Sequence, residues 1–309
     1  MIKNNIIGGK VILTGEHAVV YGIPAISLPF NKSSIKSTLK KSNNNFCIIF
    51  NNQTYHFNNL INDLTPLKVL MNKLSSDLNL NINDYKLIIK SSLAFQKGLG
   101  FSASLTISIV KAFYKFFKIN LDESKLIEYT LLTEKLNHIN PSGIDMLTII
   151  KNKVLFLKNL NNYEILNLNV DGYLLVVDSG INSNTKESVL NVKEYFDKNS
   201  HNKINTLNEF KTLSNNIKND LINNDLINLG YNLNLNHNLL NKLGVSHPFI
   251  DNLINISLKN KALGAKITGS GNGGCFIILA DSLLNSIKLK RIMLKNKAHK
   301  VYRVNLRKI

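Results

Sequence analysis

Two carboxylates stand on either side of a break in a predicted helix. The segment TEKLNHINPSGID ends the helix expected over residues 123–138, because Pro141 and Gly143 stop a helix and turn the backbone. Glu134 then lies one or two turns back on this helix, and Asp145 begins the next element. One carboxylate can hold Mg²⁺ while the other accepts a proton from a hydroxyl, which is what phosphoryl transfer to an alcohol requires. An exposed helix charge and a turn residue are the structural alternatives for the two.

A glycine-rich turn, GLGFSAS, precedes another predicted helix. Its residues are Gly98, Leu99, Gly100, Phe101, Ser102, Ala103 and Ser104. The two glycines allow a tight turn, and their amides point toward the positive end of a helix that begins near Ser102, which makes an anion site. Ser102 or Ser104 would cap this helix, and a further hydroxyl there can reach a metal ion bound to phosphates. The alternative is an ordinary glycine turn with a serine cap. A P-loop kinase is excluded because G-x-x-x-x-G-K-[ST] does not occur.

A second glycine cluster, KITGSGNGGCFIIL, runs into an apolar stretch that reads as a strand. So many glycines beside a strand indicate close backbone approach by a ligand or by another loop. The cluster comprises Gly269, Ser270, Gly271, Asn272, Gly273 and Gly274.

The opening segment, GGKVILTGEHAVVYGIPAISLPF, supplies a cation and a polar pair. Lys10 stands at the head of a predicted strand, and Glu16 and His17 interrupt an apolar stretch that should be buried. Buried polar groups need partners. A substrate hydroxyl, Lys10 and the Glu-His pair can satisfy one another, and the alternative is an internal salt bridge with a core histidine.

Alternating strand and helix signals position these segments. Apolar or β-branched runs predict strands near 9–14, 25–30, 46–50, 86–91, 153–157, 173–178, 265–268 and 275–280. Apolar residues spaced by three and four predict helices over 65–78, 102–118, 123–138, 185–197, 206–221, 223–236 and 248–260. This mixture indicates an α/β or α+β protein, with a boundary in a turn region around Asn161 to Asp171.

The composition of the 309 residues excludes several classes of protein. A hydrophobic content of 44% supplies a core, and the two cysteines, Cys47 and Cys275, show no zinc or redox spacing. The net charge of +18 is spread along the chain without an arginine-aromatic cluster, so we attribute it first to composition, then to attraction of anionic substrates, and last to nucleic acid. Neither a signal peptide nor a stretch of ~20 apolar residues is visible, which predicts a cytoplasmic protein without a membrane partner.

Three segments together resemble the motifs of the GHMP kinase superfamily. They are GKVILTGEHAVVYGIPAI at 9–26, GLGFSAS at 98–104 and KITGSGNGGC at 266–275, in the family's order. Within the superfamily, GEHAVVYGIPA, HINPSGID and DSGINSNTKESV are similar to the mevalonate kinases. The resemblance implies a two-domain α+β fold. Residues 1–165 would form an N-terminal domain like the second domain of ribosomal protein S5, and residues 166–309 a ferredoxin-like C-terminal domain.

The same resemblance implies an ATP- and Mg²⁺-dependent conversion of mevalonate to 5-phosphomevalonate, a step of isoprenoid precursor biosynthesis. Asp145 matches the family's catalytic base, and Lys10 matches the lysine that polarises the substrate hydroxyl. Ser102 and Glu134 match the magnesium ligands, and the loop at 98–104 binds the phosphates of ATP. The positions that match substrate-facing residues are Glu16, His17 and Thr185.

Three residues depart from the family pattern. Phe101 stands where the phosphate loop usually has serine, Asn272 replaces a glycine of the third motif, and Ile139 replaces a glycine in HINPSGID. Asn tolerates left-handed backbone angles better than most residues, so Asn272 should be accommodated. The alternatives that stay open are a related kinase acting on phosphomevalonate, a galactose-type sugar or homoserine, and a non-catalytic basic RNA-binding protein. We expect a monomer or a homodimer.

Overall fold

The computed structural model describes residues 6–43, 45–56, 65–137 and 141–309, so Ile139 lies outside the described residues. The chain forms two compact units, which are described separately here. Unit 1 comprises Met1–Gly9, Ser33–Ala94 and Gly100–Asn152, and unit 2 comprises Lys10–Lys32, Phe95–Leu99 and Lys153–Ile309. Strands β1 (Ile6–Thr14) and β2 (Ala25–Lys41) each contribute residues to both units.

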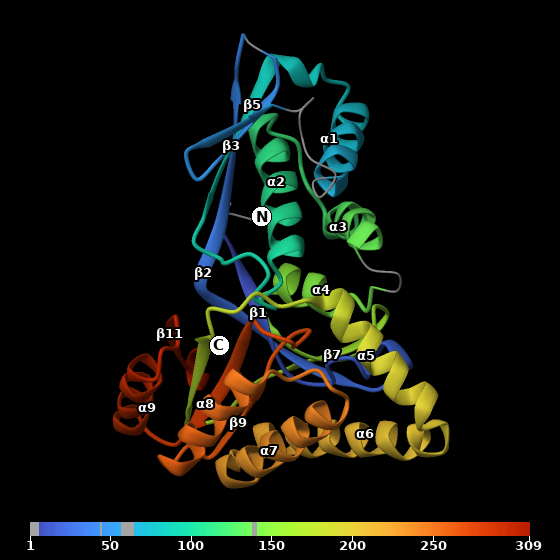
Figure 1. Cartoon of the computed structure of the whole chain (residues 1–309). Helices are drawn as coiled ribbons and strands as arrows, with labels where there is room; N and C mark the ends of the chain where they lie inside the picture. Colours follow the sequence, from blue (N-terminus) through green and yellow to red (C-terminus); the bar gives the residue numbers. More distant parts are fainter. Residues whose placement is uncertain (1–5, 44, 57–64, 138–140) are drawn as a thin grey trace. The chain divides into compact units, whose positions relative to one another are not determined.

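Unit 1 contains a sheet with helices packed against it (Figure 1). Its other elements are β3 (Cys47–Phe50), β4 (Gln53–His56), α1 (Thr65–Asp77), β5 (Tyr85–Ser91), α2 (Phe101–Phe116), α3 (Glu123–Asn137) and α4 (Ile144–Lys151). Strand β3 pairs antiparallel with β4 and parallel with β5, and β5 pairs antiparallel with β2 from Ile35 to Lys41. Helix α2 is joined to β2 by a hydrogen bond from the Ser108 hydroxyl to the Ser37 hydroxyl, 2.9 Å long.

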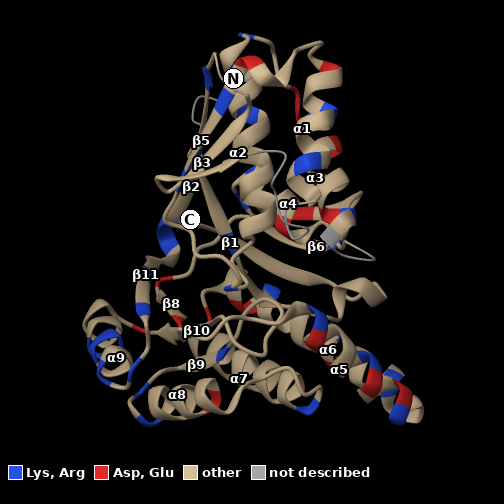
Figure 2. Ribbon diagram, turned by 45° about the horizontal axis from the view of Figure 1, so that its top comes forward, with Lys and Arg blue, Asp and Glu red and all other residues tan. Residues whose placement is uncertain are grey.

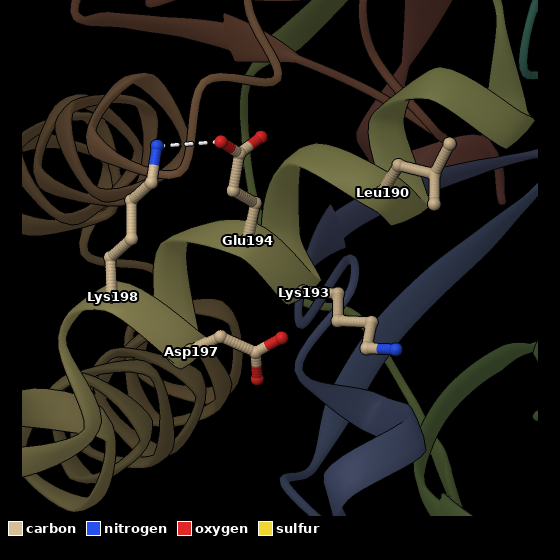
Figure 3. A pocket seen from close by; sticks show the side chains of 5 residues that line it. All are labelled: Leu190, Lys193, Glu194, Asp197 and Lys198. Atoms are coloured by element: carbon tan, nitrogen blue, oxygen red, sulfur yellow. Dashed lines mark hydrogen bonds and ion pairs between the residues drawn. The ribbon is translucent and has the colours of Figure 1, made fainter.

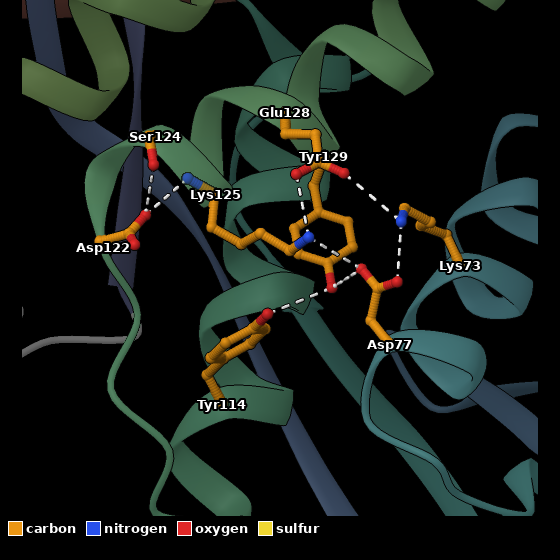
Figure 4. Close-up of polar contacts among 8 residues, drawn as sticks. All are labelled: Lys73, Asp77, Tyr114, Asp122, Ser124, Lys125, Glu128 and Tyr129. Carbon is orange, nitrogen blue, oxygen red and sulfur yellow. Dashed lines mark hydrogen bonds and ion pairs between the residues drawn. The ribbon is translucent and has the colours of Figure 1, made fainter.

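A polar cluster joins helices α1, α2 and α3 (Figure 4). The Tyr129 hydroxyl donates to Asp77 Oδ2 at 2.7 Å and lies 3.2 Å from the Tyr114 hydroxyl. Lys73 and Lys125 form ion pairs with Asp77 at 2.7 and 3.2 Å. Partial desolvation opposes ionisation of this carboxyl, but the three hydrogen-bond donors outweigh it and lower the pKa of Asp77 to about 2. The charged carboxylate therefore fixes the end of α1 against α3.

Unit 2 contains a four-stranded antiparallel sheet in the order β11-β8-β10-β9. Its elements after β2 are β6 (Val154–Asn159), β7 (Asn162–Leu166), β8 (Tyr173–Asp178), α5 (Thr185–Lys198), α6 (Ser200–Asn223), α7 (Leu226–Lys242), α8 (Pro248–Lys259), β9 (Gly264–Ile267), β10 (Cys275–Ala280), α9 (Leu283–Lys295) and β11 (Lys300–Asn305). One face of the sheet joins the helices in a core that includes Val177, Phe210, Leu240, Ile254 and Phe276. The antiparallel sheet and the helices on one side of it confirm the expected α+β class.

The predicted elements occur near their expected positions, and within the described ranges five further α-helices and strands were not predicted. Strand β4 and helix α4 are short, and β7, α9 and β11 mix apolar residues with lysine, asparagine or glutamate, so they lack the continuous apolar runs that were used to predict strands. The turn region expected around Asn161 to Asp171 contains strand β7. The Asn-rich tract at 199–241 forms α6 and α7, which confirms the helices predicted over 206–221 and 223–236. The domain boundary at residue 165 stays a prediction.

The charges of the described residues are distributed over helices and strands of both units (Figure 2). Both cysteines are free, with Cys275 buried and Cys47 half-buried. None of the helices in the described ranges has the length and hydropathy needed to cross a membrane.

Candidate functional site

The N-terminus of α2 is built differently from the predicted serine cap. Gly100, with φ +76°, is the N-cap, no side chain caps the helix, and the helix begins at Phe101. Ser104 is buried and donates its hydroxyl proton to the carbonyls of Gly100 and Gly8, each at 2.8 Å, so neither serine caps the helix and that prediction is wrong. A helix end without a side-chain cap can present its amides to an anion.

Three helices of unit 1 carry the predicted metal-binding and acidic residues. Thr106 of α2 lies 2.9 Å from Thr133 of α3, and Tyr114 lies 3.2 Å from Tyr129, so the two helices run antiparallel. Lys151, at the end of α4, pairs with Glu123, at the start of α3, at 2.6 Å. The start of α2 therefore lies beside the end of α3, and α4 contacts both helices. The predicted residues at these helix ends are Ser102, Glu134 and Asp145.

The burial of these residues decides between the alternatives left open by the sequence. Glu134 is only 7% exposed, so it is not the exposed helix charge that was the alternative. Asp145 lies in the first turn of α4 after the N-cap Gly143, with φ +76°, and is half-buried.

The donor set of these helix ends suits a magnesium ion. Ser102 and Glu134 supply a hydroxyl and a carboxylate oxygen, which are ligands that a hard cation prefers. No group of three or more His, Cys, Asp or Glu side chains gathers as a metal cage within the described ranges. Mg²⁺ commonly binds one or two protein oxygens together with water and substrate phosphates, so two donors fit this ion.

In unit 2, the start of the phosphate loop contacts the second glycine cluster. A Cβ added to Gly269 would lie 2.7 Å from Gly98 Cα, and a Cβ added to Gly98 would lie 2.9 Å from the Thr268 carbonyl oxygen. Both glycines have positive φ, +73° for Gly98 and +83° for Gly269. Of the two partners expected for the glycine cluster, another loop is confirmed. Leu99, buried beside Gly98, accepts a 3.0 Å hydrogen bond from the Lys10 amide, which joins the loop to β1.

The rest of the glycine cluster lies against other segments of unit 2. A Cβ at Gly271 would meet the Val245 carbonyl oxygen at 2.0 Å, and one at Gly273 would meet that of Asn182 at 2.4 Å. For Gly274 the nearest atom is the Lys97 carbonyl oxygen, at 3.0 Å. Asn272 adopts φ +50°, and its backbone N–H donates to the Val245 carbonyl oxygen at 2.8 Å. The left-handed angle confirms that asparagine is accommodated here.

The two other departures from the family pattern have different outcomes. Phe101 packs edge-on against Phe50 of β3, with ring centroids 6.4 Å apart, so its side chain contributes to the packing of unit 1. Ile139 lies outside the described residues.

Ser270 joins two of the three predicted substrate-facing residues. His17 Nε2 lies 2.9 Å from the Ser270 carbonyl oxygen, and the Thr185 hydroxyl lies 3.1 Å from the Ser270 hydroxyl. A carbonyl oxygen only accepts, so Nε2 carries the proton and Nδ1 is left as an acceptor. Burial lowers the pKa of His17 to about 4, so its imidazole is neutral at pH 7. His17 adopts φ +60°, a strained angle of the kind that gathers at functional sites.

Glu16 forms an internal ion pair with Lys266 of β9. An internal salt bridge was the alternative for this segment, but Lys266 was not identified as the partner. The side chains are 1% and 0% exposed, respectively. Lys10 is also buried, at 2% exposure, and lies within β1 rather than at its head. Burial raises the pKa of Glu16, and the positive charges of Lys266 and Lys10 oppose this rise. A single lysine in the apolar run GAKI was the available signal, because a charge in a buried strand needs a partner.

A second buried pair in unit 2 was also missed. Lys97 Nζ lies 3.5 Å from Asp178 Oδ1 and donates to the Ile181 carbonyl at 2.8 Å. The Ser179 hydroxyl donates to the Gly274 carbonyl at 2.7 Å. These contacts hold the phosphate loop, the end of β8 and the glycine cluster together.

An open depression on helix α5 contains none of the predicted site residues. Its lining consists of Leu190, Lys193, Glu194, Asp197 and Lys198 (Figure 3). Lys198 and Glu194 form an exposed 2.6 Å ion pair within it. One exposed helix face without buried polar groups has none of the features expected of a catalytic site.

Comparisons with known proteins agree with the arrangement of motifs. The N-terminal domain family of the GHMP kinases matches residues 65–152, and the family described as GHMP kinases C terminal matches residues 217–299. A mevalonate kinase of Methanocaldococcus jannaschii is 30% identical over 300 residues, which cover 92% of this chain and 93% of that protein.

Solved structures share the whole fold. The crystal structure of the Methanococcus jannaschii mevalonate kinase has a TM-score of 0.82 at 26% identity and covers 97% of each chain. L. major mevalonate kinase in complex with R-mevalonate also has a TM-score of 0.82, at 22% identity, and covers 98% of this chain and 95% of its own. This chain therefore belongs to the GHMP kinase family, among the mevalonate kinases.

Proposed function

We propose that this protein transfers the γ-phosphoryl group of ATP to the primary hydroxyl of mevalonate, giving 5-phosphomevalonate and ADP. The observation that carries the proposal is the similarity to a mevalonate kinase along nearly the whole chain. The helix ends of unit 1 and the buried polar residues of unit 2 support the roles proposed for individual side chains.

Asp145 is proposed as the base. As phosphorus bonds to the alcohol oxygen and the bond to the ADP oxygen breaks, the alcohol proton passes to the Asp145 carboxylate. Its place in the first turn of α4, half-buried after the N-cap Gly143, supports this role, because a base must be held in a fixed position to accept the proton. Lys10 is proposed to stabilise the negative charge that develops on the alcohol oxygen.

The phosphates of ATP are proposed to bind the backbone amides of residues 98–104. The α2 N-terminus supports this, since no side chain occupies its cap. Ser102 and Glu134 would hold Mg²⁺, which when bound neutralises charge on the phosphates. The third-motif loop at 269–274 is proposed to shape the phosphate loop through the contact between Gly269 and Gly98.

The organic part of the substrate is proposed to bind Glu16, His17 and Thr185. His17 is neutral with Nδ1 as an acceptor, so it can take a hydrogen bond from a substrate hydroxyl. A site that leaves such buried groups unpaired with a wrong ligand discriminates by roughly 10⁴-fold or more.

A substrate panel tests the proposal. The purified protein is given ATP, Mg²⁺ and either mevalonate, phosphomevalonate, galactose or homoserine, and ADP release is measured. We expect mevalonate to have the highest kcat/KM. A higher kcat/KM for another alcohol would retain the kinase family but reject this substrate. No turnover of any alcohol, together with salt-dependent RNA binding that ATP does not alter, would favour the non-catalytic alternative. The monomer or homodimer stays a prediction, which light scattering checks.

A further inference from the structure

The carboxylate of Glu16 is satisfied on one side only. Oε1 accepts a hydrogen bond from Lys266 Nζ, while the buried Oε2 has no hydrogen-bond partner among the described residues. A buried carboxylate oxygen without a donor carries a desolvation cost, so a ligand that supplies a donor gains free energy there.

Lys266 is held in one direction by its surroundings. Its strand neighbours Ala265 and Ile267 belong to the hydrophobic core, so Lys266 points to the opposite face of the sheet. Its ammonium group also donates to the Ile267 carbonyl at 2.7 Å. These contacts leave the ammonium little freedom, and they fix which carboxylate oxygen of Glu16 it engages.

We propose that Lys266 is a positioning residue for the substrate, which keeps Glu16 ionised and leaves Oε2 to accept a hydrogen bond from the tertiary hydroxyl of mevalonate. The inference rests on the proposed function for the identity of the alcohol. An ionised carboxylate only accepts hydrogen bonds, whereas a protonated one also donates, so the acceptor role requires the charge. The negative charge also directs Glu16 to a hydroxyl rather than to the substrate carboxylate.

The charges around Glu16 give the sign of the pH effect. The charged groups that act on it are Lys266 on β9 and Lys10 on β1, and the adjacent His17 is neutral. Burial raises the pKa of Glu16 and Lys266 opposes this. Without Lys266 the pKa of Glu16 rises further, the carboxyl is protonated at pH values where it is normally charged, and the acceptor is lost.

The experiment compares Lys266→Met with wild type in pH profiles of kcat/KM for mevalonate at saturating ATP. At neutral pH we expect kcat/KM to fall on the order of 10- to 100-fold, the range for a lost hydrogen bond to a charged group. The loss should diminish as the pH rises and Glu16 ionises again, and KM for ATP should stay within about twofold of wild type. The double variant Glu16→Gln/Lys266→Met should have low kcat/KM without this recovery. A folded Lys266→Met with a wild-type profile would overturn the proposal.

Lys97→Met is the matched control. It removes another buried lysine from a buried ion pair in unit 2, so it reports the effect of such a loss on packing. We expect Lys97→Met to leave unchanged the pH at which kcat/KM for mevalonate falls on the acid side of the profile, which is called the acid limb here. If it shifts that limb as Lys266→Met does, the effect is structural and the proposal fails.

A second measurement covers the case in which Lys266→Met does not fold. Glu16→Gln is compared on mevalonate and on 5-hydroxy-3-methylpentanoate, which lacks the tertiary hydroxyl. The substitution should lower kcat/KM at least tenfold more for mevalonate, and equal losses would refute the inference. If the wild-type protein prefers another alcohol, the proposed function is wrong. That result comes from the wild type alone, so it can be distinguished from a failure of the inference about Lys266.

Discussion

The contact between the phosphate loop and the third-motif loop predicts a large effect for one methyl group. In Gly269→Ala the new Cβ would lie 2.7 Å from Gly98 Cα and 2.8 Å from Gly98 O, which are backbone atoms that cannot rotate away. The residue also has φ +83°. The left-handed angle costs roughly 1–2 kcal/mol for a non-glycine residue, and overpacking adds roughly 1–3 kcal/mol.

Gly22→Ala separates these two costs. Gly22 has φ +79°, nearly the same as Gly269, but a Cβ there would meet nothing within 4 Å. It should therefore lose only the roughly 1–2 kcal/mol of the backbone angle. The difference between the two variants measures the contact between the loops.

Two assays follow the effect. Thermal unfolding should give a larger decrease in Tm for Gly269→Ala than for Gly22→Ala. Isothermal titration with ATP should give a Kd about tenfold or more higher for Gly269→Ala. The new Cβ displaces Gly98, and a loss of only about 1.4 kcal/mol of binding free energy raises the Kd tenfold. Gly22→Ala should bind ATP as wild type does. Equal Tm decreases together with an unchanged ATP Kd would refute the reasoning.

Three further predictions concern single side chains. Asp145→Asn should retain ATP binding and lower kcat by roughly 10²–10⁴-fold, and a variant with more than about half of wild-type kcat would remove Asp145 as the base. Ser102→Ala and Glu134→Gln should raise the Mg²⁺ concentration needed for half-maximal rate, and an unchanged Mg²⁺ titration would make both residues structural. His17 has a folded pKa of about 4 against 6.5 in the unfolded chain, so the unfolded state binds more protons between these values and stability decreases as the pH falls through this window. His17→Gln should therefore lose less stability than wild type between pH 7 and pH 5 in urea unfolding, and an equal loss would contradict the assignment.

The sequence predicted the helix break before Asp145 because its signals are local. Pro141 and Gly143 end one helix and begin another, and this places Asp145 in the first turn of α4. The prediction of a serine cap for α2 was wrong, although capping is also local. Ser104 donates its hydroxyl proton to the carbonyl of Gly100 in the preceding turn, and Gly100 is the N-cap.

The partners that are distant in sequence could not be predicted. Glycine spacing indicated that some backbone would approach Gly269, but nothing in a single sequence identifies Gly98 as that backbone. Lys266 and Glu16 are separated by 250 positions, so neither residue indicates the other. A charge in an apolar strand requires a partner but does not identify it.

Unit 2 is assembled from three segments that are far apart in the sequence, and this affects how the chain folds during translation. Ile12 exchanges backbone hydrogen bonds with the Thr268 side chain, 256 positions later, at 2.9 and 3.0 Å. The Ile12 backbone is therefore synthesised long before the Thr268 side chain exists, although β1 can pair with β2 as soon as both have emerged. Contacts of such long sequence separation slow folding, and an exposed strand of this kind is a site where nascent chains aggregate. We expect the N-terminal residues of unit 2 to bind chaperones during translation, and a chain cut before β9 to leave the Ile12 amide and carbonyl without the Thr268 hydroxyl.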